Sequence, residues 1–238
     1  MKLDLLVFAA HPDDAELGCG GTIIKHVLLG KKVGIVDLTR GEMGTRGNAD
    51  LRAKESLAAS KVLGVAVREN LGFEDAFFRN DKAHQLGVMT MIRKYQPDII
   101  LCNAVSDRHP DHGRAGQLIS EANFYSGLIK VPTTDEGKPQ TCWRAKAVYH
   151  YIQDRYIKPD FAIDITEVME KKMKAIHAYK SQFYSELSKE PITPISTKEF
   201  IEALYARATE YGRPFGVRYA EGFTAERIPG VHSLFDLK

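Results

Sequence analysis

Apolar runs alternate along the first half of the chain with stretches in which apolar residues recur at helical spacing. The apolar runs predict buried strands at about 3–10, 33–38, 65–68 and 98–102. The amphipathic stretches that follow them predict helices at about 15–29, 50–63, 84–95 and 112–125. This alternation is typical of a mainly parallel sheet with helices on both faces, so we predict a single α/β domain with a Rossmann-like sheet.

The pattern is less regular beyond residue 130. There we predict a polar loop at 131–139, strands at about 145–152 and 161–165, a helix at about 167–180, a loop at 186–194, a helix at about 197–210 and a short Gly- and Tyr-rich segment. The core sheet is therefore expected within about residues 1–165. The C-terminal helices and the elements on the substrate side are expected within about 166–238 of the same domain.

Composition narrows the class of protein. A chain of 238 residues with 44% hydrophobic content can bury one large core, and a net charge of +2 without a dense Lys/Arg run makes nucleic acid an unexpected partner. No apolar run approaches the roughly 18 residues that cross a bilayer, so no membrane partner is expected either. The three cysteines are far apart and odd in number, which favours a reducing compartment and predicts a cytoplasmic protein.

Two clusters of histidine and aspartate follow predicted strands. His11-Pro12-Asp13-Asp14-Ala15-Glu16 follows the first strand, and His109-Pro110-Asp111-His112 comes soon after the fourth. Open α/β sheets bind ligands at the carboxyl ends of their strands, so we expect the two clusters to lie together. Asp13 or Asp14 could instead cap the next helix, but capping explains neither His11 nor Glu16. The role of Glu16 stays open between a helix start and support of a neighbouring ligand.

The residue types in these clusters suit a catalytic metal centre. Catalytic zinc sites use three protein ligands of His or carboxylate type and leave one position for water. His11, Asp14 and His112 supply two imidazoles and one carboxylate, a set that would lower the pKa of bound water towards about 7. We therefore expect Zn²⁺ as the cofactor, with Fe²⁺ as the alternative, because this donor set accepts several divalent ions.

The remaining polar groups of the clusters suit proton transfer. Asp13, adjacent to a ligand, is the candidate general base for the water. His109 comes three residues before His112, so the two imidazoles share one side of a helical turn. Asp111 is expected to accept a hydrogen bond from His109 and to favour its protonated form, which would stabilise an oxyanion. The predicted catalytic residues are thus Asp13, His109 and Asp111.

These clusters resemble the signatures AHPDDE and HPDH of the zinc-dependent N-acetylglucosamine deacetylases, the LmbE-like family typified by the phosphatidylinositol-glycan and mycothiol-pathway enzymes. Residues 10–16 read AHPDDAE, with one inserted alanine, and residues 109–112 match the second signature in full. The resemblance implies that His11, Asp14 and His112 ligate zinc and that Asp13 is the base. It also implies that His109, supported by Asp111, stabilises the oxyanion or acts as an acid, and that the protein is a homo-oligomer, a trimer or hexamer.

Further segments resemble the subgroup that makes bacillithiol by deacetylating N-acetylglucosaminyl malate. They are Leu38–Gly47, Arg52, Glu55, Ser181–Phe183 and Tyr219–Phe223. The resemblance implies a small-molecule N-acetylglucosamine conjugate as substrate, foremost N-acetylglucosaminyl L-malate. Arg46 and Arg52 are expected to bind the malate carboxylates by bidentate pairing, unless they are solvated loop charges. A thiol conjugate, an inositol or a chitin-type sugar would present the same acetamide, and the sequence does not place the tyrosine that assists the oxyanion in relatives.

Two other classes of protein share features with this sequence. Gly18-Cys19-Gly20-Gly21 and Asp37 are similar to a dinucleotide-binding fingerprint, but Ile23 stands where its last glycine belongs and Gly18 comes eight residues after Ala10. A non-enzymatic sugar- or protein-binding module could also share the fold. Because all six residues of the predicted site are present, we interpret the chain as a zinc-dependent N-deacetylase that hydrolyses an amide bond.

Overall fold

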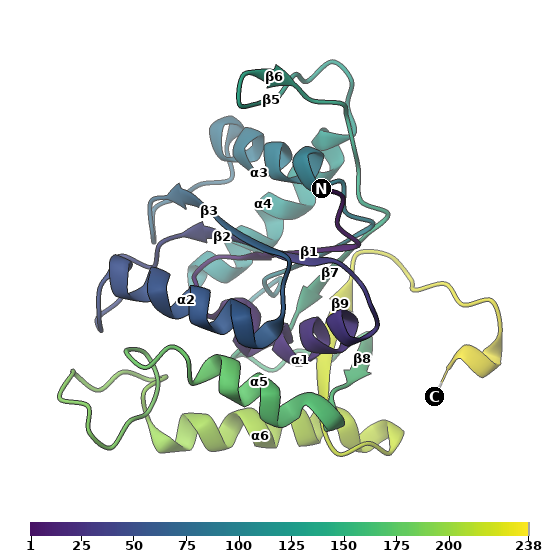
Figure 1. Ribbon diagram of the computed structural model, residues 1–238. Helices are drawn as coiled ribbons and strands as arrows, with labels where there is room; N and C mark the ends of the chain where they lie inside the picture. Colours follow the sequence, from purple (N-terminus) through teal and green to yellow (C-terminus); the bar gives the residue numbers. More distant parts are fainter. Residues whose placement is uncertain (238) are drawn as a thin grey trace.

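The strands predicted from the sequence and one further strand near the C-terminus join into one seven-stranded sheet in the computed structural model, which describes residues 1–237 (Figure 1). The order across the sheet is β3-β2-β1-β4-β7-β9-β8. These strands are β1 (Leu5–Ala9), β2 (Val33–Thr39), β3 (Val67–Phe73), β4 (Ile99–Cys102), β7 (Ala147–Tyr151), β8 (Phe161–Asp164) and β9 (Ala220–Ala225). The predicted α/β fold with a mainly parallel sheet is confirmed.

Helices connect the strands close to the predicted positions. The α-helices are α1 (Asp14–Leu28), α2 (Ala49–Leu63), α3 (Lys82–Tyr95), α4 (Pro110–Ser126), α5 (Met169–Ile176) and α6 (Lys198–Gly212), and the 3-10 helices are η1 (Thr166–Val168), η2 (Arg213–Phe215) and η3 (Leu234–Asp236). The helix predicted at 167–180 is shorter than expected. The predicted loop at 131–139 contains a small hairpin of β5 (Thr134–Asp135) and β6 (Lys138–Pro139).

The last strand corrects the predicted extent of the sheet. β9 lies between β7 and β8 and pairs antiparallel with both, while the pairs among β1, β2, β3, β4 and β7 are parallel. The sheet is therefore not confined to residues 1–165. The reason is that the Gly- and Tyr-rich segment after α6 returns to the sheet and fills the position between two strands that are adjacent in sequence.

Strict alternation along β1 builds two cores, one on each face of the sheet. Leu5, Val7 and Ala9 pack with helices α1, α2, α5 and α6, whereas Leu6 and Phe8 pack with α3 and α4. Figure 1 shows the same division, with α3 and α4 on one side of the sheet and the other four helices opposite. The fold is thus three layers, with both faces of the sheet covered.

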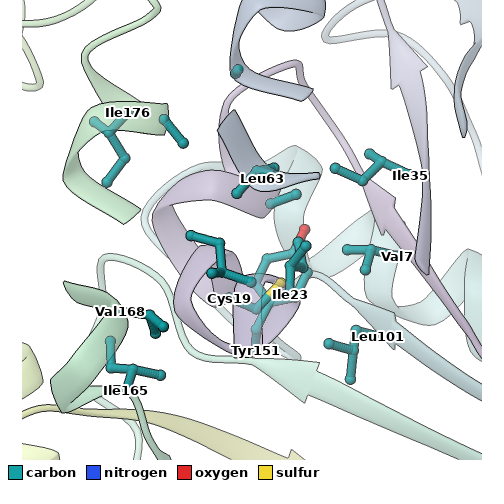
Figure 2. Close-up of a cluster of buried hydrophobic side chains, with 14 of the residues drawn as sticks. Val7, Cys19, Ile23, Ile35, Leu63, Leu101, Tyr151, Ile165, Val168 and Ile176 are labelled. Carbon is teal, nitrogen blue, oxygen red and sulfur yellow. The ribbon is translucent and has the colours of Figure 1, made fainter. Parts of the chain in front are cut away.

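The glycine-rich run of the rejected nucleotide-binding hypothesis lies inside α1. A Cβ on Gly18 would lie 2.2 Å from Cδ2 of Tyr151, and one on Gly21 would lie 2.7 Å from Ile165. Figure 2 shows Cys19 and Ile23 of the same helix in the core beside Tyr151. These glycines let α1 approach the sheet closely, so their role is packing and not the binding of a phosphate.

Within residues 1–237, no helix is long and apolar enough to span a membrane. The carboxyl ends of β1, β2, β3, β4 and β7 all lie at one edge of the sheet, because these strands run parallel. The residues that directly follow them therefore meet at that edge.

Candidate active site

The turn between β1 and α1 holds both aspartates of the first cluster. The backbone N–H of His11 donates to Oδ2 of Asp14 at 2.9 Å, and Asp14 is the first residue of α1. Asp13 has φ of 118°, a strained backbone conformation for a residue other than glycine, and its side chain makes no capping hydrogen bond. The capping alternative is therefore wrong for Asp13, whose carboxylate faces the cavity described below.

His11, Asp14 and His112 come together as the sequence predicts. Nδ1 of His11 lies 3.5 Å from Oδ2 of Asp14, and Nε2 of His112 lies 3.2 Å from Oδ1 of the same carboxylate. All three side chains are buried. One carboxylate thus lies between two imidazoles from the carboxyl ends of two neighbouring strands.

Two amides that the sequence analysis did not select hold the carboxylate of Asp14. Asn103, directly after β4, donates to Oδ2 at 3.0 Å, and Gln153, soon after β7, donates to Oδ1 at 3.0 Å. Burial alone would raise the pKa of Asp14, but the charges and hydrogen bonds of His112 and His11 outweigh it and hold this pKa well below its usual range. Asp14 is therefore kept ionised and in a fixed orientation.

Carboxylates also fix the outer nitrogen of each imidazole. Nδ1 of His112 lies 2.5 Å from Oδ2 of Asp107, and Nε2 of His11 lies 3.0 Å from Oδ1 of Asp75. Burial opposes protonation of His112, but Asp14 and Asp107 raise its pKa to about 9. Such outer hydrogen bonds orient the ring of a metal-binding histidine and leave its other nitrogen free for the ion.

Asp111 supports a different histidine from the one expected. Its Oδ2 lies 3.2 Å from Nε2 of His11, and its Oδ1 accepts from Nη1 of Arg114 at 2.6 Å. Between Asp111 and His109 the hydrogen bond runs from the backbone N–H of Asp111 to Nδ1 of His109, at 3.3 Å. The expectation that the Asp111 carboxylate accepts a hydrogen bond from His109 is therefore wrong, because this carboxylate is directed to His11 and Arg114.

His109 lies at the N-cap of α4, half-buried at the cavity wall. Burial, together with the charges of His11 and His112, lowers its pKa, which corrects the expectation of a protonated ring. Because Nδ1 accepts the N–H of Asp111, the proton of the neutral ring lies on Nε2. His109 is thus placed to donate one hydrogen bond as a neutral imidazole.

Asp13 is buried beside a guanidinium. Burial raises the pKa of Asp13 to about 7, against the charge of Arg52, whose Nη1 lies 3.8 Å from Oδ2. Arg52 also donates to Oε1 of Gln182. Of the two arginines predicted to bind substrate, Arg52 is therefore directed to the predicted base.

Arg46, unlike Arg52, has no carboxylate beside it and retains an unpaired N–H group. It is buried, and it donates to the carbonyl of Gln182 at 3.3 Å and to Oγ of Ser188. Its Nε has no hydrogen-bond partner, and no carboxylate within residues 1–237 forms an ion pair with it. A buried cation without a counter-charge is unfavourable unless an anion binds there.

All eight predicted site residues except Asp111 line one cavity of about 380 Å³. Arg108, Asp154 and Arg207 add polar groups to its wall. An apolar side is formed by Thr193, Pro194, Ile195, Phe200 and Leu204 from the loop before α6 and from α6 itself. A polar end with a carboxylate and imidazoles beside an apolar wall is typical of a small-molecule site.

Two groups of side chains in the described part of the chain bring donor atoms within 4.8 Å of one another. The first is His11, His109 and His112; the second is His11, Asp75 and Asp111. In the second group both carboxylates face the same nitrogen of His11, Nε2, so they support the ring. The chemistry of the remaining donors, imidazole nitrogens with the Asp14 carboxylate between two of them, fits a divalent transition metal.

Comparison with known families gives a match at this site. Residues 6–123, which include both His/Asp clusters, match the PIG-L family, described as GlcNAc-PI de-N-acetylase. A diacetylchitobiose deacetylase from Thermococcus kodakarensis is 32% identical over 95% of this chain and 84% of its own length. A probable N-acetyl-alpha-D-glucosaminyl L-malate deacetylase 2 from Bacillus anthracis is 26% identical over 77% of this chain and 83% of its own length.

A relative with another activity also matches. A 4-oxalmesaconate hydratase from Pseudomonas putida is 29% identical over 74% of this chain and 73% of its own length. Among solved structures, a conserved protein from Thermus thermophilus superimposes with a TM-score of 0.86 at 35% identity, covering 96% of this chain and 97% of that one. The fold therefore recurs over nearly the whole length of the chain.

Proposed function

Because this chain belongs to the PIG-L family and is a deacetylase of N-acetylglucosamine-type conjugates, we propose that its substrate is N-acetylglucosaminyl L-malate. The observation that carries this proposal is Arg46, a buried cation at the cavity with an unpartnered Nε and no acidic partner in residues 1–237. An anionic aglycone would supply the missing counter-charge. The match to the malate deacetylase from Bacillus anthracis supports the same substrate.

The proposed metal ligands are His11, Asp14 and His112, with Zn²⁺ as the ion and Fe²⁺ as the alternative. Each imidazole offers one nitrogen next to Asp14, while its other nitrogen is held by a carboxylate. This arrangement of ligand and outer hydrogen bond supports the assignment. When bound, such an ion supplies Lewis acidity towards the acetamide carbonyl and water.

Asp13 and His109 have separate roles in the reaction. Asp13 accepts a proton from the attacking water, whose oxygen bonds to the acetamide carbon. Nε2–H of His109 donates to the oxygen of the tetrahedral intermediate; a well-placed donor of this kind contributes about 3–4 kcal/mol. As the C–N bond breaks, the proton held by Asp13 passes to the departing nitrogen, so that acetate and a free glucosamine amine leave. Arg52 positions Asp13 and balances its charge.

The test of the substrate is a comparison of aglycones. We expect kcat/KM for N-acetylglucosaminyl L-malate to exceed that for diacetylchitobiose, and Arg46→Gln to raise KM for the malate conjugate at least tenfold. The neutral disaccharide carries no carboxylate, so its KM should change little in the same variant. Preferred turnover of diacetylchitobiose, with no effect of Arg46→Gln on either substrate, would overturn the malate proposal and leave the deacetylase activity standing.

We also propose that the working form is an assembly of several copies, the trimer or hexamer that the family resemblance implies. Supporting this, the large apolar side chains of Ile228, Leu234 and Phe235, after β9, are exposed, as is expected where another copy covers them.

A further inference from the structure

The segment after β9 is an apolar arm. This arm, Glu226–Leu237, leaves the body of the protein beyond the edge of the sheet (Figure 1). Phe235 is 97% exposed and Ile228 is 91% exposed, and Val231, Leu234 and Leu237 are exposed as well. Several large apolar side chains gathered on one short exposed segment mark an interaction surface.

The tip of the arm is ordered by its own hydrogen bonds. The side chain of Ser233 accepts from the N–H of Phe235 at 3.2 Å, and Oδ2 of Asp236 accepts from the N–H groups of His232 and Ser233, both at 3.1 Å. These bonds form a capping box around η3. The arm therefore presents Leu234 and Phe235 from a defined turn. The hydrogen bonds that join the arm to the body of the chain lie at its base, where Glu226 contacts His150 and Arg227 donates to the carbonyl of Lys146.

A second cavity, of about 250 Å³, lies away from the active site. Its walls are mostly apolar: Leu5, Ile99, Leu101, Tyr149, Phe161, Ile163 and Phe223. Asp4 and Asp98, which directly precede β1 and β4, line it as well, so it opens at the amino ends of the strands. This is the edge of the sheet opposite the predicted catalytic residues.

The arm starts at the same edge. β9 runs antiparallel to β7, and its last residue, Ala225, pairs with Tyr149 of the cavity wall. No residue of the arm lines the cavity. Leu28 and Leu29 are exposed between His26 and Lys31, and the latter two line the cavity. One end of the molecule thus carries the apolar cavity, the exposed side chains of Leu28 and Leu29, and the apolar arm, which does not fill the cavity.

We propose that the arm of one copy packs into this cavity of a second copy of the chain, with Phe235 as the main anchor. An extended arm of about twelve residues reaches at most about 40 Å, enough to cross an interface between copies. A second copy is the occupant that the structure favours, because donor and acceptor are on the same chain, and a closed symmetric exchange covers both on every copy. A small ligand in the cavity would leave the arm exposed.

The inference rests on the proposed assembly and not on the substrate, so its test avoids turnover as a readout. Phe235→benzoylphenylalanine is prepared as an equal mixture of isotopically light and heavy protein, irradiated and analysed by mass spectrometry. We expect cross-linked peptides of mixed isotope composition that contain Tyr149, Phe161 or Phe223. Cross-links only within one isotope, or mixed cross-links confined to other surfaces, would overturn the proposal.

A second measurement follows the association directly by sedimentation. The double variant Leu234→Asp/Phe235→Asp should associate at least tenfold more weakly than the unmodified protein, with an unchanged far-UV circular dichroism spectrum. Ile129→Asp is the matched control, because Ile129 is 85% exposed on the loop after α4 and should leave association unchanged. A double variant that associates normally would overturn the role of the arm, and an unmodified protein that stays monomeric would overturn the assembly as well.

Discussion

Nδ1 of His112 lies 2.5 Å from Oδ2 of Asp107, and both residues are buried. This hydrogen bond directs Nε2 of the ring towards Asp14, at 3.2 Å. Asp107→Asn keeps Oδ1, which accepts from the N–H groups of Asp154 and Arg155, but it places an amide where the ring needs an acceptor. We expect metal affinity to fall about 10- to 100-fold, measured by competition with a chelator.

Asp154→Asn is the matched control for this prediction. This variant makes the same chemical change, aspartate to asparagine, at the wall of the same cavity. The side chain of Asp154 contacts Arg108 and Arg207 and not an imidazole. The metal affinity of the variant should equal that of the unmodified protein. Equal affinities for Asp107→Asn and the unmodified protein would mean that Asp107 does not orient His112.

Substitutions within the two His/Asp clusters should affect metal binding and proton transfer separately. We expect Asp13→Asn to retain its metal and to lose about 10²- to 10⁴-fold in kcat, because it removes the base without removing a ligand. Asparagine is chosen because it tolerates positive φ, which Asp13 adopts at 118°. His112→Ala should lose the metal, as determined by elemental analysis of the purified protein.

Two sets of metal ligands share His11 and His112 and differ in the third ligand, Asp14 or His109. The variant His109→Ala distinguishes them. If Asp14 is the third ligand, this variant keeps its metal and loses turnover. Loss of metal equal to that in His112→Ala would instead assign the ion to the three histidines that lie within 4.8 Å of one another. An active Asp13→Asn would exclude Asp13 as the base.

The sequence predicted those parts of the fold that have strong periodicity. β1 and α1 follow a continuous apolar run and a helical pattern, and both lie within a few residues of the prediction. β9 was missed because Ala220–Ala225 contains small residues and Glu221, which reads as polar surface. In the structure Glu221 is buried, where it accepts from Nζ of Lys172 at 2.7 Å. Strand formation there depends on distant partners, which no local pattern encodes.

The same limit applies to the site. His11, Asp14 and His112 were predicted because they belong to dense clusters at strand ends. Asp75 and Asn103 lie outside the His/Asp clusters, and each follows a strand at or near its end, β3 and β4 respectively. Their position relative to the sheet was the signal that could have selected them. The partner of Asp111 depends on the direction of its side chain, which spacing alone does not determine.

Because α1 packs closely on the sheet, the addition of one methyl group to this helix at Gly18 should destabilise the protein. A Cβ on Gly18 would lie 2.2 Å from Cδ2 of Tyr151, a fully buried ring whose hydroxyl donates to the carbonyl of Phe8 at 2.9 Å. Alanine in a helix is favoured over glycine by about 1 kcal/mol, but the overlap outweighs this gain. We expect Gly18→Ala to destabilise the protein by about 1–3 kcal/mol in thermal denaturation.

Gly20→Ala, in the same helix, provides the comparison for Gly18→Ala. A Cβ there would lie at ordinary contact distance, 3.4 Å, from Cγ of Lys172, and the backbone does not have a positive φ. Its melting temperature should match that of the unmodified protein. Equal melting temperatures for the two variants would show that α1 can move away from Tyr151 at little cost.

Glu16, whose role the sequence left open, belongs to a buried ion cluster. Its Oε1 accepts from Nη1 of Arg68 at 2.6 Å and from the hydroxyl of Tyr179 at 3.1 Å. Nε and Nη2 of Arg68 donate to the carboxylate of Asp37 at 2.7 and 2.9 Å. One guanidinium thus pairs with two buried carboxylates and ties the first turn of α1 to β2 and β3.

Removal of that guanidinium should therefore cost far more than the loss of an exposed ion pair. Arg68→Met leaves Glu16 and Asp37 buried without a counter-charge, and we expect the free energy of unfolding in urea to fall by about 3–5 kcal/mol. Arg40→Met breaks a 2.6 Å contact with Asp50, but both side chains are exposed, so the loss should be about 1 kcal/mol or less. Equal losses in the two variants would mean that water reaches the cluster and screens its charges, in which case Glu16 would not anchor the first turn of α1.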